Sequence, residues 1–109
     1  MTDPANRPLG SLEQAIMDVI WRDAPSSVHE VLAALEGRDL AYTTVMTTMD
    51  RLHKKGLLSR TKRSHAYLYE PVFSREEFER RLVSAMLGGL PSASRDALLA
   101  GFLDFAGED

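Results

Sequence analysis

The chain contains no cysteine, only three histidines and no glycine-rich phosphate loop. The lack of cysteine excludes disulfides, thiol catalysis and thiolate metal sites, and it fits a reducing cytoplasm. His29, His53 and His65 fall on separate predicted elements, with no carboxylate cluster at ligand spacing beside them. We therefore expect no metal, no cofactor and no enzymatic activity. No run of about 18 apolar residues is present, so we also expect no membrane insertion.

Charge is unevenly distributed along the chain. The 109 residues, 44% of them apolar and 27% charged, are typical of one globular domain with a modest core. The net charge is −3, yet residues 41–65 hold six basic side chains against one acidic side chain, which gives +5. The rest of the chain holds seven basic and fifteen acidic residues, which gives −8. A basic segment in an acidic protein is typical of a nucleic-acid-binding surface.

The basic segment begins with a predicted helix over Ala41–Gly56. At about 100° per residue, Val45, Met49 and Leu52 fall on one apolar stripe, with Thr48 at its edge. The opposite stripe carries short hydroxyl and charged side chains, namely Thr43, Thr47, Asp50, Arg51 and Lys54. Hydroxyls that fit against base edges, followed by cations for phosphates, suit a helix in a DNA groove. An ordinary amphipathic surface helix is the alternative interpretation.

Two helices are predicted before the basic segment. Ser11 precedes Gln14, and Ser27 precedes Glu30, at the three-residue spacing of a capping box. Apolar residues recur at helical spacing after each of these starts. They are Leu12, Ile16, Val19 and Ile20 in the first helix, and Val28, Val31, Leu32 and Leu35 in the second.

Several residues near these two helices have individual expectations. Trp21 is interpreted as a core or interface residue. Residues 23–25 should end the first helix, and Gly37 should end the second. A brief extended segment is expected around Ser26. His29 is expected to face solvent, with no partner that would make it a site.

After Gly56 the pattern changes to a period of about two residues. Residues 57–62 and 66–72 are predicted to be two strands joined at 63–65. The tip carries Lys62, Arg63 and His65, which extend the basic segment, although a solvated run of charge is the alternative. A hairpin of two strands is only marginally stable alone, so we expect it to lie on the helices.

Two apolar helices are predicted after the hairpin. Ser74 begins the first, with Glu77 at capping-box spacing, and residues 88–91 should end it. Ser92 or Ser94 should cap the second. Their apolar surface exceeds what two helices can hide, so we expect a homodimer. The predicted dimerisation residues are Phe78, Leu82, Met86, Leu98, Phe102 and Leu103.

The predicted class is mainly α with a small β-hairpin (α+β). Residues 1–10 should form a flexible leader, and 11–72 a winged helix-turn-helix DNA-binding domain. Residues 73–109 should form a helical dimerisation region. The agreement among these separate patterns supports the class more than any one of them.

Three stretches, SLEQAIMDVIW, LAYTTVMTTMDRLHKKGLL and AYLYEP, resemble the penicillinase-repressor family (BlaI/MecI type) of winged-helix transcriptional repressors. The resemblance runs from Leu9 to Val72. It implies a cytoplasmic homodimer on a palindromic double-stranded DNA operator, often upstream of β-lactamase or related resistance genes. It also implies a recognition helix at 41–55, a wing at 60–65 and a dimer-forming part at 74–105.

The combined prediction assigns twelve residues to DNA binding. They are Tyr42, Thr43, Thr44, Met46, Thr47, Arg51, Lys54, Lys55, Arg60, Lys62, Arg63 and His65. Staphylococcal members of the family carry basic residues where this chain has Thr43 and Met46, so their operator sequence does not transfer to it.

The resemblance also implies a route of inactivation. Family repressors are cleaved at an Asn-Phe bond in response to a membrane sensor linked to a protease. The matching bond here is Gly101-Phe102, so we expect cleavage to be slow or absent.

Two other functions are compatible with a winged helix. One is a module that binds another protein instead of DNA, which a salt titration of binding to random duplex would distinguish. The other is a ligand-sensing regulator of a different family, which a thermal-shift screen would reveal.

Overall fold

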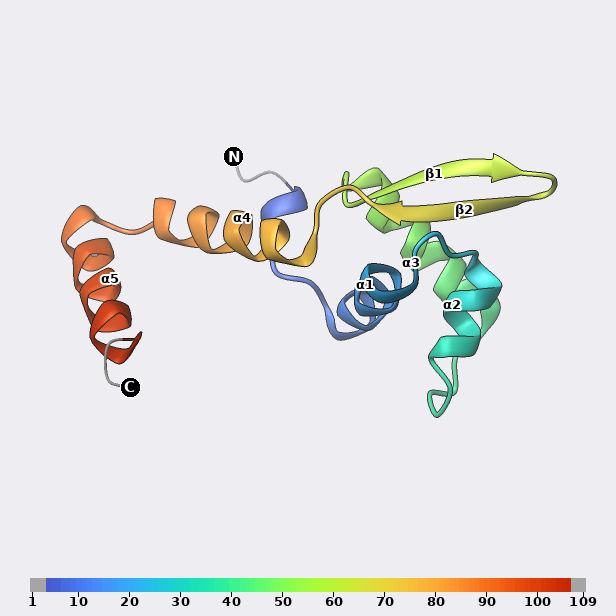
Figure 1. Ribbon diagram of the computed structural model, residues 1–109, viewed down its shortest axis with the longest axis horizontal. Coiled ribbons are helices and arrows are strands. Elements are labelled where there is room, and N and C mark those ends of the chain that lie inside the picture. Colours follow the sequence, from blue (N-terminus) through green and yellow to red (C-terminus); the bar gives the residue numbers. More distant parts are fainter. Residues whose placement is uncertain (1–3, 107–109) are drawn as a thin grey trace.

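The computed structural model describes residues 4–106 (Figure 1). Its elements in chain order are η1 (Pro4–Asn6), α1 (Ser11–Asp23), α2 (Val28–Ala34), α3 (Tyr42–Lys54), β1 (Leu58–Arg63), β2 (Ala66–Pro71), α4 (Arg75–Gly88) and α5 (Ser92–Ala106). Helices α1, α2 and α3 pack together, and the antiparallel hairpin of β1 and β2 lies beside α3. Helix α4 leads away from this unit to α5, at the opposite end of the molecule from the hairpin tip. The predicted class and element order are confirmed.

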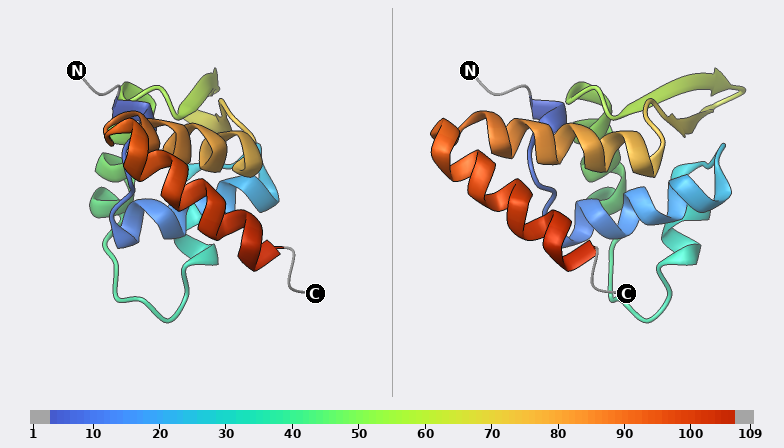
Figure 2. Two further views of the ribbon diagram at one scale, coloured as in Figure 1. Left: turned by 90° about the vertical axis from the view of Figure 1, so that its left-hand side faces the viewer. Right: turned by 60° about the vertical axis from the view of Figure 1, so that its left-hand side comes forward.

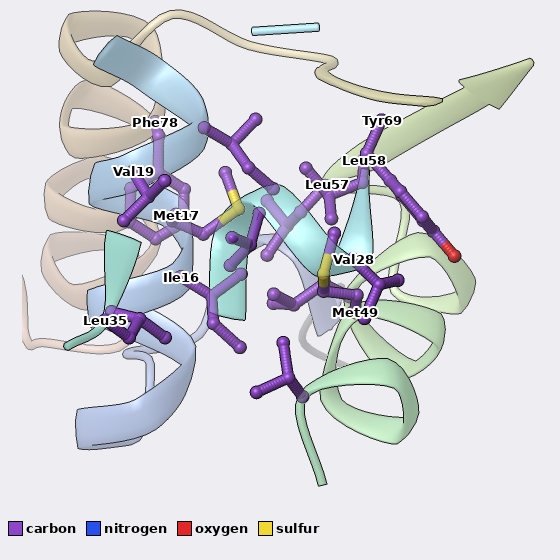
Figure 3. Close-up of a cluster of buried hydrophobic side chains, with 14 of the residues drawn as sticks. Ile16, Met17, Val19, Val28, Leu35, Met49, Leu57, Leu58, Tyr69 and Phe78 are labelled. Atoms are coloured by element: carbon purple, nitrogen blue, oxygen red, sulfur yellow. The ribbon is translucent and has the colours of Figure 1, made fainter. Parts of the chain in front are cut away.

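One continuous core joins the three packed helices to the hairpin and to the start of α4 (Figure 3). The predicted stripe of α3 is confirmed, because Val45, Met49 and Leu52 are fully buried. Thr48 at its edge is buried as well, and its hydroxyl donates to the Thr44 carbonyl oxygen at 2.8 Å. This bond within the helix allows a polar side chain to lie against the core.

Helix α1 begins at Ser11, as predicted, but its cap lies one residue before the predicted capping box. Gly10 is the cap, Ser11 is already helical, and Glu13 rather than Gln14 closes the first turn. The Gly10 amide donates to Glu13 Oε1 at 3.1 Å, while the Gln14 amide group donates to Asp18 Oδ1 at 2.9 Å. The predicted Ser11–Gln14 capping box was therefore wrong, because the carboxylate at the third helical position satisfies the cap amide better than the following amide side chain.

The starts of two other helices follow the predicted chemistry. Ser27 accepts from the Glu30 amide at 3.1 Å and its own amide donates to Glu30 Oε1 at 3.0 Å, so this box is confirmed. Ser74 accepts from the Glu77 amide at 3.1 Å. The Glu77 carboxylate instead pairs with Arg80 and Arg81, so only half of that box forms.

The predicted ends of α2 and α3 and the predicted start of α5 have different outcomes. Helix α2 ends at Ala34, before Gly37, which takes φ +94° in the following turn. Gly56 takes φ +84° directly after α3, as predicted. Helix α5 begins with Ser92, and the Pro91 carbonyl accepts its first bond, so neither predicted serine is the cap.

The hairpin is attached to the helices through a third extended segment. Ser26 and Tyr69 exchange both backbone bonds, at 3.0 and 2.8 Å, which confirms the predicted extended segment. In the hairpin, Arg60 stands opposite Tyr69 and Lys62 opposite Tyr67. The turn between α1 and α2 thus holds β2, while β1 lies against α3.

The first turns of α4 belong to the core of the helical unit. Phe78 is 3% exposed and its ring centroid lies 5.6 Å from that of Trp21, beside Val19 and Met17 of α1 (Figure 3). Leu82, one turn later, packs on the edge of the same cluster. The prediction that Phe78 is a dimerisation residue was wrong, because its own chain already buries it.

The amino-terminal segment also differs from the predicted flexible leader. Residues 4–6 form the short helix η1 against α4, and Ala5 is only 5% exposed. The rest of α4 and all of α5 project from the unit. The radius of gyration is 16.9 Å, against about 13 Å for a compact chain of this length.

Candidate nucleic-acid interface

The outer face of α3 forms an exposed ridge of small polar and apolar side chains. Thr43, Thr44, Met46 and Thr47 are all exposed, and Tyr42 is exposed at the start of the helix. A hollow of about 320 Å³ separates this ridge from the hairpin. A second hollow, of about 460 Å³, lies on the side of α1. A helix that projects beyond its neighbours in this way has the shape needed to enter a DNA groove.

Asp50 joins α3 to the hairpin through two cations. Its carboxylate accepts from Lys54 at 3.0 Å and from Arg60 Nη1 at 2.9 Å. The same Arg60 nitrogen lies 3.4 Å from the Tyr69 hydroxyl, and the guanidinium stands 4.3 Å from the Tyr67 ring centroid. The bonds from Lys54 and then Arg60 hold the pKa of Asp50 below its ordinary range. Arg60, predicted to bind phosphate, therefore lies against the wing and α3 instead of projecting freely.

Lys55 has a structural partner across the helical unit. Its Nζ lies 2.6 Å from Glu13 Oε2, and the Lys55 and Glu13 side chains are 30% and 14% exposed. Burial favours the neutral form of Glu13, but the bonds from Lys55 and from the Gly10 amide outweigh it, so the pKa of Glu13 lies below its ordinary value. Lys55, predicted to contact DNA, instead attaches the end of α3 to α1.

The remaining predicted cations are open to solvent. Arg51 on α3 and Lys62, Arg63 and His65 at the hairpin tip are exposed, and within residues 4–106 the structure shows no ion pair to any of them. Lys54 keeps a side chain that is 74% exposed despite its pairing with Asp50. The surface thus presents cations both beside the α3 ridge and at the hairpin.

Two histidines have partners that sequence reasoning missed. His29 is exposed, as predicted, and its ring lies 4.5 Å from the Tyr42 ring, centroid to centroid. His53 Nδ1 lies 2.9 Å from the Leu58 carbonyl oxygen. Both contacts involve residues on different elements, and helical periodicity carries no signal for them. The part of the chain that the structure describes contains no cluster of metal-ligating side chains.

The structure exposes most of the apolar residues predicted for a dimer and covers the others. Met86, Leu98, Phe102 and Leu103 are exposed by 54–68%, whereas Phe78 is buried and Leu82 is half-buried. Gly101 is exposed beside Phe102. Within residues 4–106 no helix is both long and apolar enough to cross a membrane.

Three helices followed by a hairpin that lies against the third helix define a winged helix-turn-helix domain. The penicillinase repressor family model matches residues 9–107, so the chain belongs to the penicillinase repressor family. The chain is 44% identical over 104 residues to the transcriptional regulator BlaI of Mycobacterium tuberculosis, covering 93% of this chain and 75% of that protein.

Two solved structures support the same assignment. The DNA-binding domain of the repressor BlaI superposes with a TM-score of 0.59 at 26% identity, over 70% of this chain and 90% of that one. The monomeric form of Bacillus licheniformis BlaI in complex with the blaP half-operator gives a TM-score of 0.55 at 27% identity, over 64% and 87%. These relatives are transcriptional regulators, and none is an enzyme.

Proposed function

We propose that the chain is a homodimeric repressor that inserts α3 into the major groove of a palindromic operator. The observation that carries this proposal is the exposed ridge of α3, which presents three threonines and Met46 between open cations. Threonine hydroxyls bond to base edges, and threonine and methionine methyl groups contact the methyl of thymine. Family membership and the half-operator complex of the similar BlaI domain support the same use of this helix.

The assigned roles follow the positions of the side chains. Thr43, Thr44, Met46 and Thr47 read bases, and Tyr42 contacts the sugar-phosphate backbone beside them. Phosphates are held by the open side chains of Arg51, Lys54, Lys62, Arg63 and His65. Lys55 and Arg60 keep the helix and the hairpin in place.

The exposed apolar side chains of the last two helices support the homodimer. Met86, Leu98, Phe102 and Leu103 have no cover within the described chain, and their exposure is far greater than that of the core. A second copy that supplies the same helices would bury them around a two-fold axis, and a palindromic operator has the matching symmetry.

The regulated genes are proposed from the family. We propose that the repressor acts in the cytoplasm on β-lactamase or related resistance genes. The Gly101-Phe102 bond replaces the Asn-Phe bond that sensor-linked proteolysis cuts in relatives, so derepression by that route is slow or absent.

The test is selection of bound duplexes from a random pool, followed by a salt titration on the selected site and on random DNA. We expect an inverted pair of half-sites, bound about 10³- to 10⁷-fold more tightly than random DNA. Binding to all duplexes with equal affinity, or to none, would overturn the proposal. Sequencing the neighbouring genes for a membrane metalloprotease would then test the link to β-lactam sensing.

A further inference from the structure

The start of α4 is fixed to α1 by contacts among four side chains and one backbone carbonyl. The Trp21 indole N–H donates to the Phe73 carbonyl oxygen at 2.9 Å, and the Trp21 ring packs on Phe78. The Arg75 guanidinium lies 4.9 Å from the centroid of the Trp21 ring, and its Nη1 donates to Asp18 Oδ1 at 2.9 Å. We call these residues, Asp18, Trp21, Phe73, Arg75 and Phe78, the α4 anchor.

Little freedom remains between the DNA-binding unit and α4. Only residues 72–74 separate the end of β2 from the start of α4, and Ser74 caps the helix. On another side, η1 packs against α4 (Figure 2). Ala5 of η1 is buried. The direction of α4 is therefore set where the helix starts.

Arg75 and Asp18 stand at the rim of the anchor, where each side chain is 44% exposed. An ion pair as open as this contributes little to folding. The apolar contact between Trp21 and Phe78 supplies the burial. The ion pair therefore bears on the orientation of α4 more than on the stability of the fold.

A small rotation at the anchor has a large effect at the far end of α4. The helix has 14 residues and is about 21 Å long at about 1.5 Å per residue. A turn of about 10° at its start displaces its end by about 4 Å. Successive base pairs are spaced about 3.4 Å apart, so this displacement equals roughly one base-pair step.

We propose that Arg75, through Asp18 and Trp21, fixes the angle between α1 and α4 and thereby selects the spacing between the two half-sites of the operator. The inference rests on the proposed function, because it needs two DNA-binding units joined through the last helices. Arg75 is a positioning residue that contacts no base. Without its ion pair and ring contact, α4 samples a wider range of angles and the dimer accepts half-sites at several spacings.

The test uses full-length Arg75→Ala and Asp18→Asn proteins in the same selection from random duplexes. Wild type should select one spacing, whereas both variants should select the same half-site sequence at a broader set of spacings. On duplexes that differ by one or two base pairs in spacing, the preference for the wild-type spacing should fall about tenfold. That loss is a part of the roughly 10²- to 10⁴-fold gain from linking two sites.

Arg80→Ala is the matched control, because Arg80 lies on the same helix and, within residues 4–106, forms its ion pair with Glu77 of that helix and not with α1. It should keep the wild-type spacing. Affinity for a single half-site and the melting temperature should be unchanged in all three variants.

The inference is overturned if Arg75→Ala or Asp18→Asn retains the wild-type spacing. It is also overturned if half-site affinity falls in parallel with operator affinity, because the anchor would then act on folding alone. If wild type itself selects no paired half-sites, the proposed function fails first and the inference falls with it.

Discussion

Asp50 on α3 and Arg60 on β1 form an ion pair, with 2.9 Å between Oδ1 and Nη1, that connects the outer face of the helix to the hairpin. The partner atoms are not deeply buried, since the side chains are 36% and 24% exposed. Their arrangement places one guanidinium between the carboxylate and two tyrosines, so the hairpin is held at a defined distance from the α3 ridge.

This pair predicts that Arg60 and Arg63 behave differently on DNA. Arg63→Ala should weaken binding to operator and random duplex alike and lower the salt slope by about 0.9, because one phosphate contact is lost. Arg60→Ala should weaken operator binding more than random binding and leave the slope nearly unchanged, and Asp50→Asn should reproduce this pattern. Affinities at several salt concentrations provide the measurement. An equal change of slope in both arginine variants would show that Arg60 binds phosphate.

The α3 ridge predicts opposite effects for two adjacent threonines. Thr47→Ala should reduce operator affinity by about 1–3 kcal/mol and random-DNA affinity very little, with no change in stability. Thr48→Ala should lower the free energy of unfolding instead, because that side chain is buried and bonded to the Thr44 carbonyl. Binding to both duplexes and urea unfolding measure the two effects. Equal losses of Thr47→Ala on operator and random DNA would exclude α3 as the reading element.

Phe78 of α4 and Phe102 of α5 are predicted to have separate roles. Phe102→Asp should give a monomer, since it places a charge in the apolar surface proposed for the partner, while the DNA-binding unit stays folded. Phe78→Ala should instead lower the free energy of unfolding by about 3–5 kcal/mol. Sedimentation velocity across a range of concentrations reports the first effect and thermal melting the second. A wild-type protein that sediments as a monomer at all concentrations would contradict the proposed dimer.

Exposure to β-lactam is predicted to leave the Gly101-Phe102 bond intact. The residue before Phe102 lacks the asparagine side chain of the cleaved bond in relatives. The measurement is the intact mass of the protein recovered from treated cells, with a Gly101→Asn variant as the comparison. A wild-type fragment that ends at Gly101 would contradict the prediction.

Acid should weaken the contact between α1 and the end of α3. The pKa of Glu13 lies below its ordinary value of 4.5 in the folded protein, so its contribution to stability is complete above about that pH. The contribution is lost as the pH falls through the lower folded pKa. Glu13→Gln should therefore be less stable than wild type at neutral pH, and the difference should shrink in acid. Urea unfolding across the pH range tests this, with the exposed Glu70→Gln as the control; a difference that grows in acid would contradict it.

Local patterns in the sequence determined most of the elements. The buried stripe of α3 follows from the spacing of Val45, Met49 and Leu52, because a helix places residues at that spacing on one face whatever surrounds it. The Ser27–Glu30 box and the left-handed Gly56 are equally local, since their partners lie within one turn of the chain. The change to a period of about two residues after Gly56 indicated the hairpin, and the order of the predicted helices and strands indicated the class of fold.

Only the tertiary structure decided how residues of the same kind are used. Phe78 and Phe102 lie at similar apolar spacing on neighbouring helices, but Trp21 of α1 covers only Phe78. Lys55 and Lys62 belong to one basic segment, yet Lys55 meets Glu13, which lies 42 positions earlier. Pairings across such distances depend on how the helices pack. They cannot be predicted from the sequence pattern around either partner.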